Sequence, residues 1–438
     1  MQRPLLVFMA ACLGGSQLLA QTTTSSEPSE TPTAKQTVQT IRDLGKRDEK
    51  SLPALARYLS DSDPEVRVEA VKAIVKIDTM RSLEPLLTAM RDNDGEIQLR
   101  AIDGLVNAYV PGYVARGGVT GYFTKGVRQV KSLFSERNDT VVDPDVKVRP
   151  DVAAALSEKI ISGNGMDVRS NAALAAGILR AADTVPALEK GLRSKNGDVI
   201  FECLIALQKI KDPSAGPSVS FLARDLDDRV QSTALETLGI LRSLTSADDI
   251  RYAYKSARNI RIQRAALECL AMFGLAADRP LFQQNLESKD ADLRSSALEG
   301  LGRVREPDDY PAVQTAFEEA NADWRVHSAA AFAMCMEGNS SVDDLGPLQF
   351  LVEGFSLKQR ANVSGAYLSE LSRRQESRAA LAKILPETLR ERKIGILNAL
   401  SSAGGESLQI IRQYTSDRDK DVAFAAMRAA RIAQQAAM

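Results

Sequence analysis

Short blocks along the chain carry an apolar residue, a small residue four positions later and another apolar residue four positions after that. Val199, Cys203 and Leu207 form one such block. Residues at positions i, i+4 and i+8 share one face of an α-helix, whereas a half-buried strand needs strict alternation. Strand signals are nearly absent from the chain. The pattern therefore predicts an all-α protein whose helices each bury one apolar face.

These blocks recur at a nearly constant distance. Their first residues, termed anchors, are Val66, Ile97, Val168, Val199, Val230, Ile262, Leu293, Trp324, Leu357 and Val422. From Val168 to Trp324 the step between successive anchors is about 31 residues and varies by only one. A degenerate block begins with the charged residue Glu391, followed by Gly395 and Ala399. A fixed period of this length is typical of stacked supersecondary units, so we predict an α-solenoid (superhelix) of about eleven repeats.

Each repeat is predicted to contain two helices. Three positions before most anchors stands a residue that suits a helix N-cap, and these residues are Asp63, Asp94, Asn196, Asp227, Asp290, Asn321 and Asp419. Their side-chain oxygens can accept a backbone N–H that the first helical turn leaves unpaired. Prolines that suit the first turn of an earlier helix stand twelve or thirteen positions before an anchor, at Pro53, Pro85, Pro186, Pro217, Pro280 and Pro311. The unit is therefore a helix, a short turn and a capped helix.

The repeated pattern Pro-x-Leu…Asp-x-Asp/Glu-Val-Arg-x-x-Ala-x-x-Ala/Gly-Leu resembles HEAT repeats, and in particular the short bacterial type found in phycobilisome lyases. The resemblance covers roughly residues 50–436 and is interrupted once. It is specific for the fold and unspecific for activity. It implies a scaffold or adaptor that binds other proteins, because the family mainly supplies such proteins.

Residues 1–20 have the features of a secretory signal. Arg3 gives a positive start, an apolar core follows, and the segment ends in smaller, more polar residues before Ala20. We expect cleavage after Ala20, with lipoprotein processing at Cys12 as the alternative. The apolar stretch is too short to cross a bilayer. The sequence thus predicts an exported protein of the bacterial periplasm or cell envelope, without a transmembrane helix in the mature chain.

The remainder divides by composition and periodicity. Residues 21–36 are rich in Thr, Ser, Glu and Pro, which predicts a disordered tether. Residues 37–108 hold a capping helix around Ile41 and the first repeats. Residues 109–149 interrupt the frame, and repeats resume over 150–438.

The composition argues against catalysis and against nucleic-acid binding. With 56 Lys and Arg and 57 Asp and Glu, the net charge is −1, so the basic excess of a DNA- or RNA-binding protein is missing. His327 is the only histidine. The di-iron hydroxylase branch of the HEAT family uses several His-Glu pairs, and a Ser-His-Asp or Cys-His site would also depend on this one residue. We therefore expect no enzyme activity, catalytic residue, cofactor or metal.

The three cysteines that follow the signal are expected to be buried core residues. Cys203, Cys269 and Cys335 fall within helix stripes two or more repeats apart, too far to form disulfides. A reactive thiol is the alternative interpretation.

Charged residues flank the anchors in register. Acids precede the anchor at Glu65, Glu96, Asp167, Asp198, Asp292, Asp323 and Asp421, and arginines follow it at Arg67, Arg169, Arg294 and Arg325. In one interpretation they form a charged ligand groove. In the other they are a structural ladder, in which acids complement the helix dipole and arginines reach the adjacent repeat's cap.

The interruption at 109–149 is the candidate binding element. The step from Ile97 to Val168 is more than twice the ordinary one, which leaves an insertion of about 40 residues. Between Tyr109 and Ser135 it has four basic residues and no acidic one. The candidate partner-binding residues are Tyr113, Arg116, Tyr122, Phe123, Lys125, Arg128 and Lys131. The segment could equally cover an exposed edge of the repeats.

Two hypotheses of function follow from these patterns. The first is an exported, non-enzymatic scaffold that binds a protein partner. The alternative is a module that docks on anionic lipid or cell-wall polymer through the basic insertion, as a peripheral envelope protein.

Overall fold

The computed structural model describes residues 33–114, 141–144 and 146–435. Among these residues no β-strand occurs, and helices pack pairwise in sequence order. The N-terminal helices are α1 (Ala34–Leu44), α2 (Leu52–Arg57), α3 (Pro64–Ile77), α4 (Leu83–Ala89) and α5 (Gly95–Tyr109). The predicted all-α solenoid is confirmed.

The central repeats follow residues 109–149. They comprise α8 (Pro150–Ser162), α9 (Met166–Ile178), α10 (Val185–Gly191), α11 (Gly197–Ile210), α12 (Gly216–Val219), α13 (Asp228–Ile240), α14 (Ala247–Lys255), α15 (Ile260–Phe273), α16 (Arg279–Asn285), α17 (Ala291–Val304), α18 (Tyr310–Glu318) and α19 (Trp324–Met336). The C-terminal helices are α20 (Pro347–Glu353), α21 (Ala361–Leu371), α22 (Gln375–Ile384), α23 (Arg390–Leu400), α24 (Leu408–Arg412) and α25 (Lys420–Gln435).

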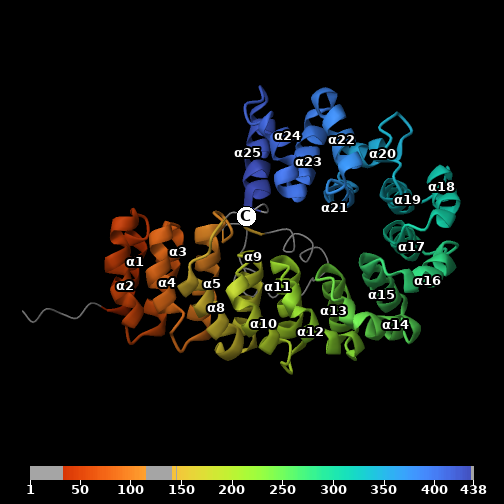
Figure 1. Ribbon diagram of the computed structural model, residues 1–438. Coiled ribbons are helices and arrows are strands. Elements are labelled where there is room, and N and C mark those ends of the chain that lie inside the picture. The colour runs from red at the N-terminus through yellow and green to blue at the C-terminus, as the bar shows by residue number, and fades with distance from the viewer. Residues whose placement is uncertain (1–32, 115–140, 145, 436–438) are drawn as a thin grey trace, which may run out of the picture.

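The two helices of each repeat form two layers. The first helices, such as α10, α14 and α16, lie on the outside, and the second helices, such as α9, α13 and α17, line the inside (Figure 1). We term the surface of the second helices the inner face. The predicted stripes bury as expected, because Val199, Cys203 and Leu207 are fully buried in α11. Small residues let neighbouring second helices approach closely. A Cβ on Gly302 of α17 would stand 2.5 Å from Cα of Ala333 in α19.

The predicted caps are present in most repeats. The Asp94 carboxylate accepts the backbone N–H of Glu96 at 2.7 Å, and Asp290 accepts those of Asp292 and Leu293 at 3.1 Å each. The same geometry occurs at Asp63, Asn196, Asp227 and Asp419. One cap was missed, since the Asn259 side chain accepts the Ile262 N–H at 3.1 Å and begins α15.

Two anchors of the sequence analysis are wrong. Asn321 does not cap α19, because the Asp323 side chain accepts the Arg325 N–H at 2.9 Å and the helix begins one residue later. The buried anchor of this helix is Val326 rather than the half-buried Trp324. The turn before α19 is two residues longer than a constant step allows, and the aspartate next to the helix takes the cap position.

The second wrong anchor is Leu357, which is 43% exposed and lies outside any α-helix. Helix α21 starts at Ala361 and buries Ser364 and Leu368 instead. Its register is set by a close approach to the preceding turn, because a Cβ on Gly354 would stand 1.9 Å from the Ser364 hydroxyl.

The array turns back on itself. Helices α1 to α15 form one arm, the chain turns through α16 to α19, and α20 to α25 form a second arm that runs back toward the first (Figure 1). The buried core divides accordingly into one cluster from Ile41 to Met334 and another from Ala331 to Ala433, with α19 contributing to both. At the end of the second arm, Arg428 donates to Asp143 at 2.8 Å. No helix in the described ranges is long and apolar enough to span a membrane.

Candidate functional site

A polar pocket opens on the inner face where the second arm approaches the first. It has a volume of about 350 Å³ and lies between α13, α15 and α17 on one side and α21 on the other. Its lining includes the carboxylates of Glu236, Glu268 and Glu299 and the ring of Tyr367. We term this pocket the inner cleft.

The three glutamates occupy the same position in three successive repeats. Glu236, Glu268 and Glu299 each stand six positions after their anchor, so they follow one another at the step of the repeat itself. Stacked second helices bring equivalent positions side by side, at the interaxial spacing of about 8–10 Å. The repeat register therefore places a row of acids along the floor of the inner cleft.

The walls of the cleft disfavour ionisation of two of these acids. Although the Glu268 side chain still reaches solvent, crowding by the surrounding protein raises its pKa to about 8, and the charges of Glu299 and Glu236 add to this effect. Burial also raises the pKa of Glu236, which the positive charge of Arg261 partly opposes. A cation entering the cleft would relieve this unfavourable electrostatic environment.

The third acid is neutralised by a network that holds α21 in place. The Tyr367 hydroxyl donates to Glu299 Oε1 at 2.5 Å, and Arg303 donates to Glu299 Oε2 at 3.0 Å. Arg303 also donates to Glu370 Oε2 at 3.0 Å, and its guanidinium lies 4.8 Å from the centre of the Phe332 ring. Hydrogen bonding by the arginine lowers the pKa of Glu370 against the opposing effect of burial. These contacts fix the far wall of the inner cleft to α17.

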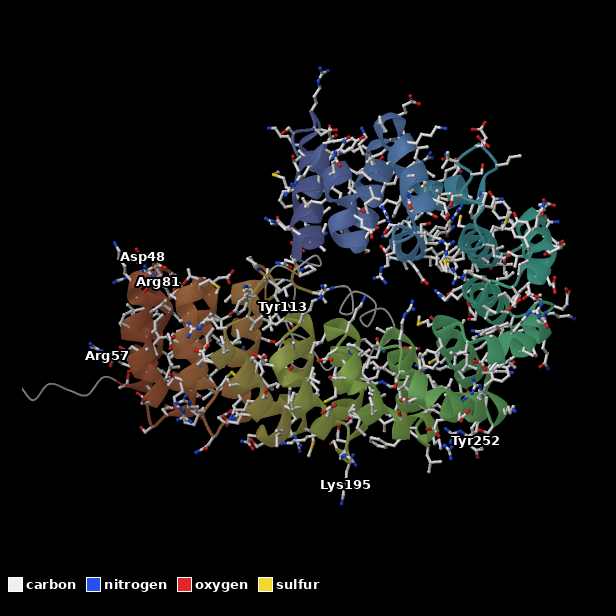
Figure 2. The ribbon with its side chains drawn as sticks, in the orientation of Figure 1. Asp48, Arg57, Arg81, Tyr113, Lys195 and Tyr252 are labelled. Carbon is white, nitrogen blue, oxygen red and sulfur yellow. The ribbon has the colours of Figure 1, made fainter. Side chains whose placement is uncertain are left out.

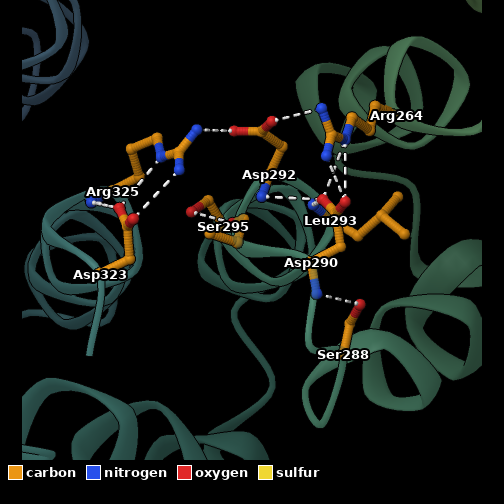
Figure 3. A network of polar contacts seen from close by, with 9 residues as sticks. Arg264, Ser288, Asp290, Asp292, Leu293, Ser295, Asp323 and Arg325 are labelled. Atoms are coloured by element: carbon orange, nitrogen blue, oxygen red, sulfur yellow. Dashed lines mark hydrogen bonds and ion pairs between the residues drawn. The ribbon is translucent and has the colours of Figure 1, made fainter. Parts of the chain in front are cut away.

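A ladder of ion pairs forms the rim of the cleft (Figure 3). Asp292 accepts from Arg264 at 3.0 Å on one side and from Arg325 at 2.6 Å on the other. Arg264 also reaches Asp290, the cap of the next second helix, at 3.0 Å, and Arg325 pairs with Asp323 at 3.0 Å.

The same ladder continues away from the cleft. Arg67 pairs with Asp92 at 2.7 Å, and Arg294 pairs with Glu319 at 2.6 Å. Arg169 departs from it and donates to the carbonyl of Ile160 at 3.0 Å. These pairings favour the structural interpretation of the flanking charges, because Arg67, Arg294 and Arg325 each connect neighbouring repeats.

Only one of the predicted partner-binding residues lies in the described ranges. Tyr113 is half-buried, follows α5 and packs against the N-terminal core (Figure 2). The other candidates, Arg116, Tyr122, Phe123, Lys125, Arg128 and Lys131, lie outside the described residues. Near Tyr113 a second pocket, also of about 350 Å³, is lined by residues that include Lys72, Asp103 and Val114.

The inner cleft was missed by the sequence analysis, although part of its signal was present. The acids six positions after the anchors of α13, α15 and α17 repeat in register, and a scan of every repeat position for charge would have found them. Tyr367 had no such signal. It lies 68 positions from Glu299 in the sequence, and the two side chains come into contact because the second arm folds back onto the first.

The single histidine has structural contacts. His327 Nε2 lies 2.7 Å from the carbonyl oxygen of Glu319, and its ring packs edge-on against Phe317 and Phe350, with centroids 6.4 and 5.9 Å away. In the part of the chain that the structure describes, no cluster of three His, Cys, Asp or Glu residues could hold a metal ion.

The three cysteines are buried and unpaired with one another, as the core interpretation predicted. Burial raises the pKa of the Cys203 thiol to about 12 and raises those of Cys269 and Cys335 as well. A high pKa disfavours the reactive thiolate.

Comparison with known proteins supports the repeat assignment. A family model described as HEAT repeats matches residues 19–106, 153–239 and 247–335, together more than half of the chain. No curated protein sequence matches the chain.

Several solved structures are similar to this chain in fold. An engineered protein is 16% identical, with 87% of this chain and 98% of that chain covered and a TM-score of 0.38. The complex of CpcE and CpcF of phycocyanin lyase from Nostoc is 17% identical, with coverages of 61% and 92% and a TM-score of 0.36. YibA from Escherichia coli is 12% identical, with coverages of 70% and 98% and a TM-score of 0.41.

Proposed function

We propose that this chain, since it belongs to the HEAT-repeat family, is a scaffold that binds a protein partner on its inner face. The observation that carries the proposal is the inner cleft, where Glu236 and Glu268 stand in register in a crowded polar pocket. The partner inserts a lysine or arginine side chain there. A pocket of about 350 Å³ has room for such a side chain.

The charge balance of the cleft favours a basic anchor over an acidic or apolar one. Arg303 already neutralises Glu299, and the rim arginines Arg264 and Arg325 are paired with aspartates. Glu236 and Glu268 remain as the acids whose pKa values are raised by their surroundings. A positively charged group bound between them lowers both pKa values and is held by the same interaction.

We further propose that the protein is exported and has no catalytic role. The signal-like segment 1–20 supports export. The contacts of His327 with Glu319 and two phenylalanine rings support a structural role for the only histidine. Stoichiometric iron or zinc in protein purified from its own cells would contradict the non-enzymatic proposal.

The scaffold proposal is tested by partner capture with cleft variants. Tagged wild-type protein and the double variant Glu236→Gln/Glu268→Gln are expressed in the native cells, and captured proteins are identified by mass spectrometry. A partner that is recovered with the wild type and lost with the double variant supports the proposal. The matched control is Glu376→Gln/Glu387→Gln, two exposed acids outside the cleft.

Unchanged capture by the double variant would contradict the cleft as the binding site. Recovery of the wild-type protein in the cytoplasmic fraction, with residues 1–20 still attached, would contradict export.

The alternative function is docking on the cell envelope through the basic insertion 109–149. The observation that favours it is the run from Tyr109 to Ser135, with four basic residues and no acidic one. The test is co-sedimentation with vesicles of anionic lipid. Salt-sensitive pelleting that is lost in Arg128→Glu/Lys131→Glu supports the alternative, and absence of pelleting rejects it.

A further inference from the structure

The second helices end in an unusual way. A helix commonly ends at a residue with left-handed backbone, and glycine is favoured there because it has no Cβ. In this chain the residue twelve positions after the anchor has positive φ in repeat after repeat. Glycine occupies it at Gly274 and, counted from the corrected anchor Val326, at Gly338, with φ of 63° and 107°. Elsewhere the position is held by Asp78, Arg180, Lys211, Arg242 and Arg305, with φ between 50° and 62°.

Three of these residues are cations in consecutive repeats. Arg180, Lys211 and Arg242 follow α9, α11 and α13 at the step of the repeat, with φ of 50°, 61° and 50°. We term them the cationic row. A positive charge at a helix C-terminus complements the helix dipole. The last turn of α11 already contains Lys209, so the dipole alone does not explain a second cation in a strained backbone conformation.

The second arm adds positive charge around this row. Its Arg373 and Arg428 come close enough to affect the cations of the first arm. Crowding and the charges of Arg180 and Arg373 lower the pKa of Lys211. Burial together with Arg428 lowers the pKa of Arg180, against the opposing charge of Asp143. Cations that disfavour one another's charged state are expected to bind an anion that separates their charges.

The acids nearby are already engaged. Asp143 accepts from Arg428 at 2.8 Å. Glu370 pairs with Arg303 at 3.0 Å and also accepts a longer hydrogen bond of 3.5 Å from Arg242, so Arg242 shares this acid with a closer arginine. Among the residues that the structure describes, the Arg180 guanidinium and the Lys211 ammonium have no hydrogen-bond or ion-pair partner. The Arg180 Nε atom is buried without an acceptor.

We propose that Arg180, Lys211 and Arg242 bind an acidic, extended segment of a partner protein. The proposal rests on the scaffold function and adds the chemistry of a second contact with the partner. Neighbouring helices stack about 8–10 Å apart, so three consecutive cations repeat at about that spacing. An extended chain rises about 3.3–3.6 Å per residue, so carboxylates at every third residue, about 10 Å apart, meet the row in register. Arginine binds carboxylates with two parallel hydrogen bonds, which suits the two ends of the row.

The surroundings favour a protein segment over a nucleic acid. The chain carries a net charge of −1, and Asp143 and Glu370 stand beside the row. A phosphate backbone would meet these acids along with the cations, whereas a peptide can place neutral residues opposite them.

The test measures direct binding of a defined probe to the full chain. The probe is a fluorescent peptide with glutamate at every third position and serine and glycine between, and its affinity is measured by fluorescence anisotropy. Substitution by glycine removes each charge and suits the left-handed backbone. Lys211→Gly and Arg242→Gly are therefore expected to keep or raise the melting temperature while they weaken binding about fivefold each.

Two controls separate charge from backbone. Lys211→Arg keeps the charge and is expected to keep the affinity. Arg305→Gly changes the same backbone position outside the row and is expected to leave the affinity unchanged.

Several outcomes would overturn the proposal. These are equal affinity of Lys211→Gly/Arg242→Gly and the wild type, equal loss in Arg305→Gly, and equal binding of a peptide with the same glutamates clustered together. Tighter binding of single-stranded DNA, lost in the same variants, would also overturn it.

The Glu236→Gln/Glu268→Gln variant distinguishes this proposal from the scaffold proposal. It alters the inner cleft and leaves the cationic row intact, so its affinity for the peptide is expected to equal that of the wild type. Failure of the peptide to bind therefore speaks against the row, and failure of partner capture speaks against the cleft.

Discussion

The central repeats and the C-terminal arm are built from similar helices but are positioned in different ways. The second helices α11, α13, α15 and α17 all begin with an Asp or Asn whose side chain caps the first turn. In the C-terminal arm, the N-cap residues of the second helices α21 and α23 are Arg360 and Leu389, and neither supplies a side-chain cap. The register of these central helices is fixed locally, whereas the register of α21 and α23 is fixed by contacts between helices.

The difference explains where the inner cleft lies. A capped helix that stacks through a small residue continues the superhelix with little freedom. Helix α21 lacks these signals, and its Tyr367 and Glu370 instead contact Glu299 and Arg303 of α17. The regular region thus supplies a repeating floor, and the irregular region supplies a wall that occurs once. A unique site requires this break in the repeat.

The largest expected effect is loss of core volume in the regular region. Phe282 is fully buried, and Gly300 of α17 makes room for its ring, since a Cβ there would stand 2.6 Å from it. Phe282→Ala is expected to lower the free energy of unfolding by about 3–5 kcal/mol. Hydrogen exchange should show lost protection in α16 and α17 first, because repeats depend on their neighbours. Phe221→Ala, at a site 49% exposed, is the control and should change little.

A smaller loss is expected from overpacking the same region. Ala234 in α13 is fully buried at the middle position of its stripe. Ala234→Leu forces apart helices that pack through this residue and should cost about 1–3 kcal/mol of unfolding free energy. Ala312→Leu adds the same volume at an exposed position of the outer helix α18. Equal urea midpoints for the two variants would contradict the assigned register.

The comparison can be sharpened by giving the irregular region a cap. Leu389 precedes α23 with an extended backbone, φ −64° and ψ 156°, and its side chain is 60% exposed. Leu389→Asp supplies the missing acceptor and is expected to raise the free energy of unfolding by about 0.5–1 kcal/mol. Leu389→Ala removes the leucine without adding a cap. A gain of the same size in that variant would show that capping is not the cause.

The inner cleft provides a pH-dependent form of the comparison. The folded pKa of Glu268, about 8, exceeds the ordinary value of 4.5. The folded state therefore binds more protons between these values, and this group's contribution to stability falls as pH rises from 4.5 to about 8. Glu268→Gln has no carboxylic acid to titrate at this position. The melting temperature of the variant should therefore rise relative to that of the wild type as the pH increases from 4.5 to about 8.

Glu370 provides the contrast of opposite sign. Its pKa is lowered by Arg303, so its ionised form stabilises the fold and that contribution is lost in acid. Glu370→Gln should lower the melting temperature at neutral pH and lose this effect in acid. A Glu268→Gln difference that does not vary with pH would contradict the crowding of that carboxylate.

The sequence predicted the parts of the fold that are encoded locally. The stripe Val199, Cys203 and Leu207 and caps such as Asp94 and Asp290 were predicted because each depends on residues within one helix turn or one stripe. The prediction at Asn321 was wrong because the turn before α19 is two residues longer than the constant step. The prediction at Leu357 was wrong because the register of α21 depends on Gly354 packing against Ser364.

The candidate sites depend on the path of the whole chain. The acids Glu236, Glu268 and Glu299 could have been found from their spacing, but their meeting with Tyr367 follows from the turn of the array. The row of Arg180, Lys211 and Arg242 becomes unusual only when its backbone angles are known. Most of the predicted insertion site, from Arg116 to Lys131, lies outside the described residues and stays a prediction.

The contact between Arg428 and Asp143 cannot form early in folding. It joins residues 285 positions apart, whereas neighbouring repeats are joined by pairs such as Arg264 and Asp290, 26 positions apart. Closing the longer loop in a flexible chain costs about 2 kcal/mol more entropy than closing the shorter one. Once the repeats have stacked, their curvature brings the two residues together at little further cost. We therefore expect folding to begin with a fast local phase and to end with closure of the two arms.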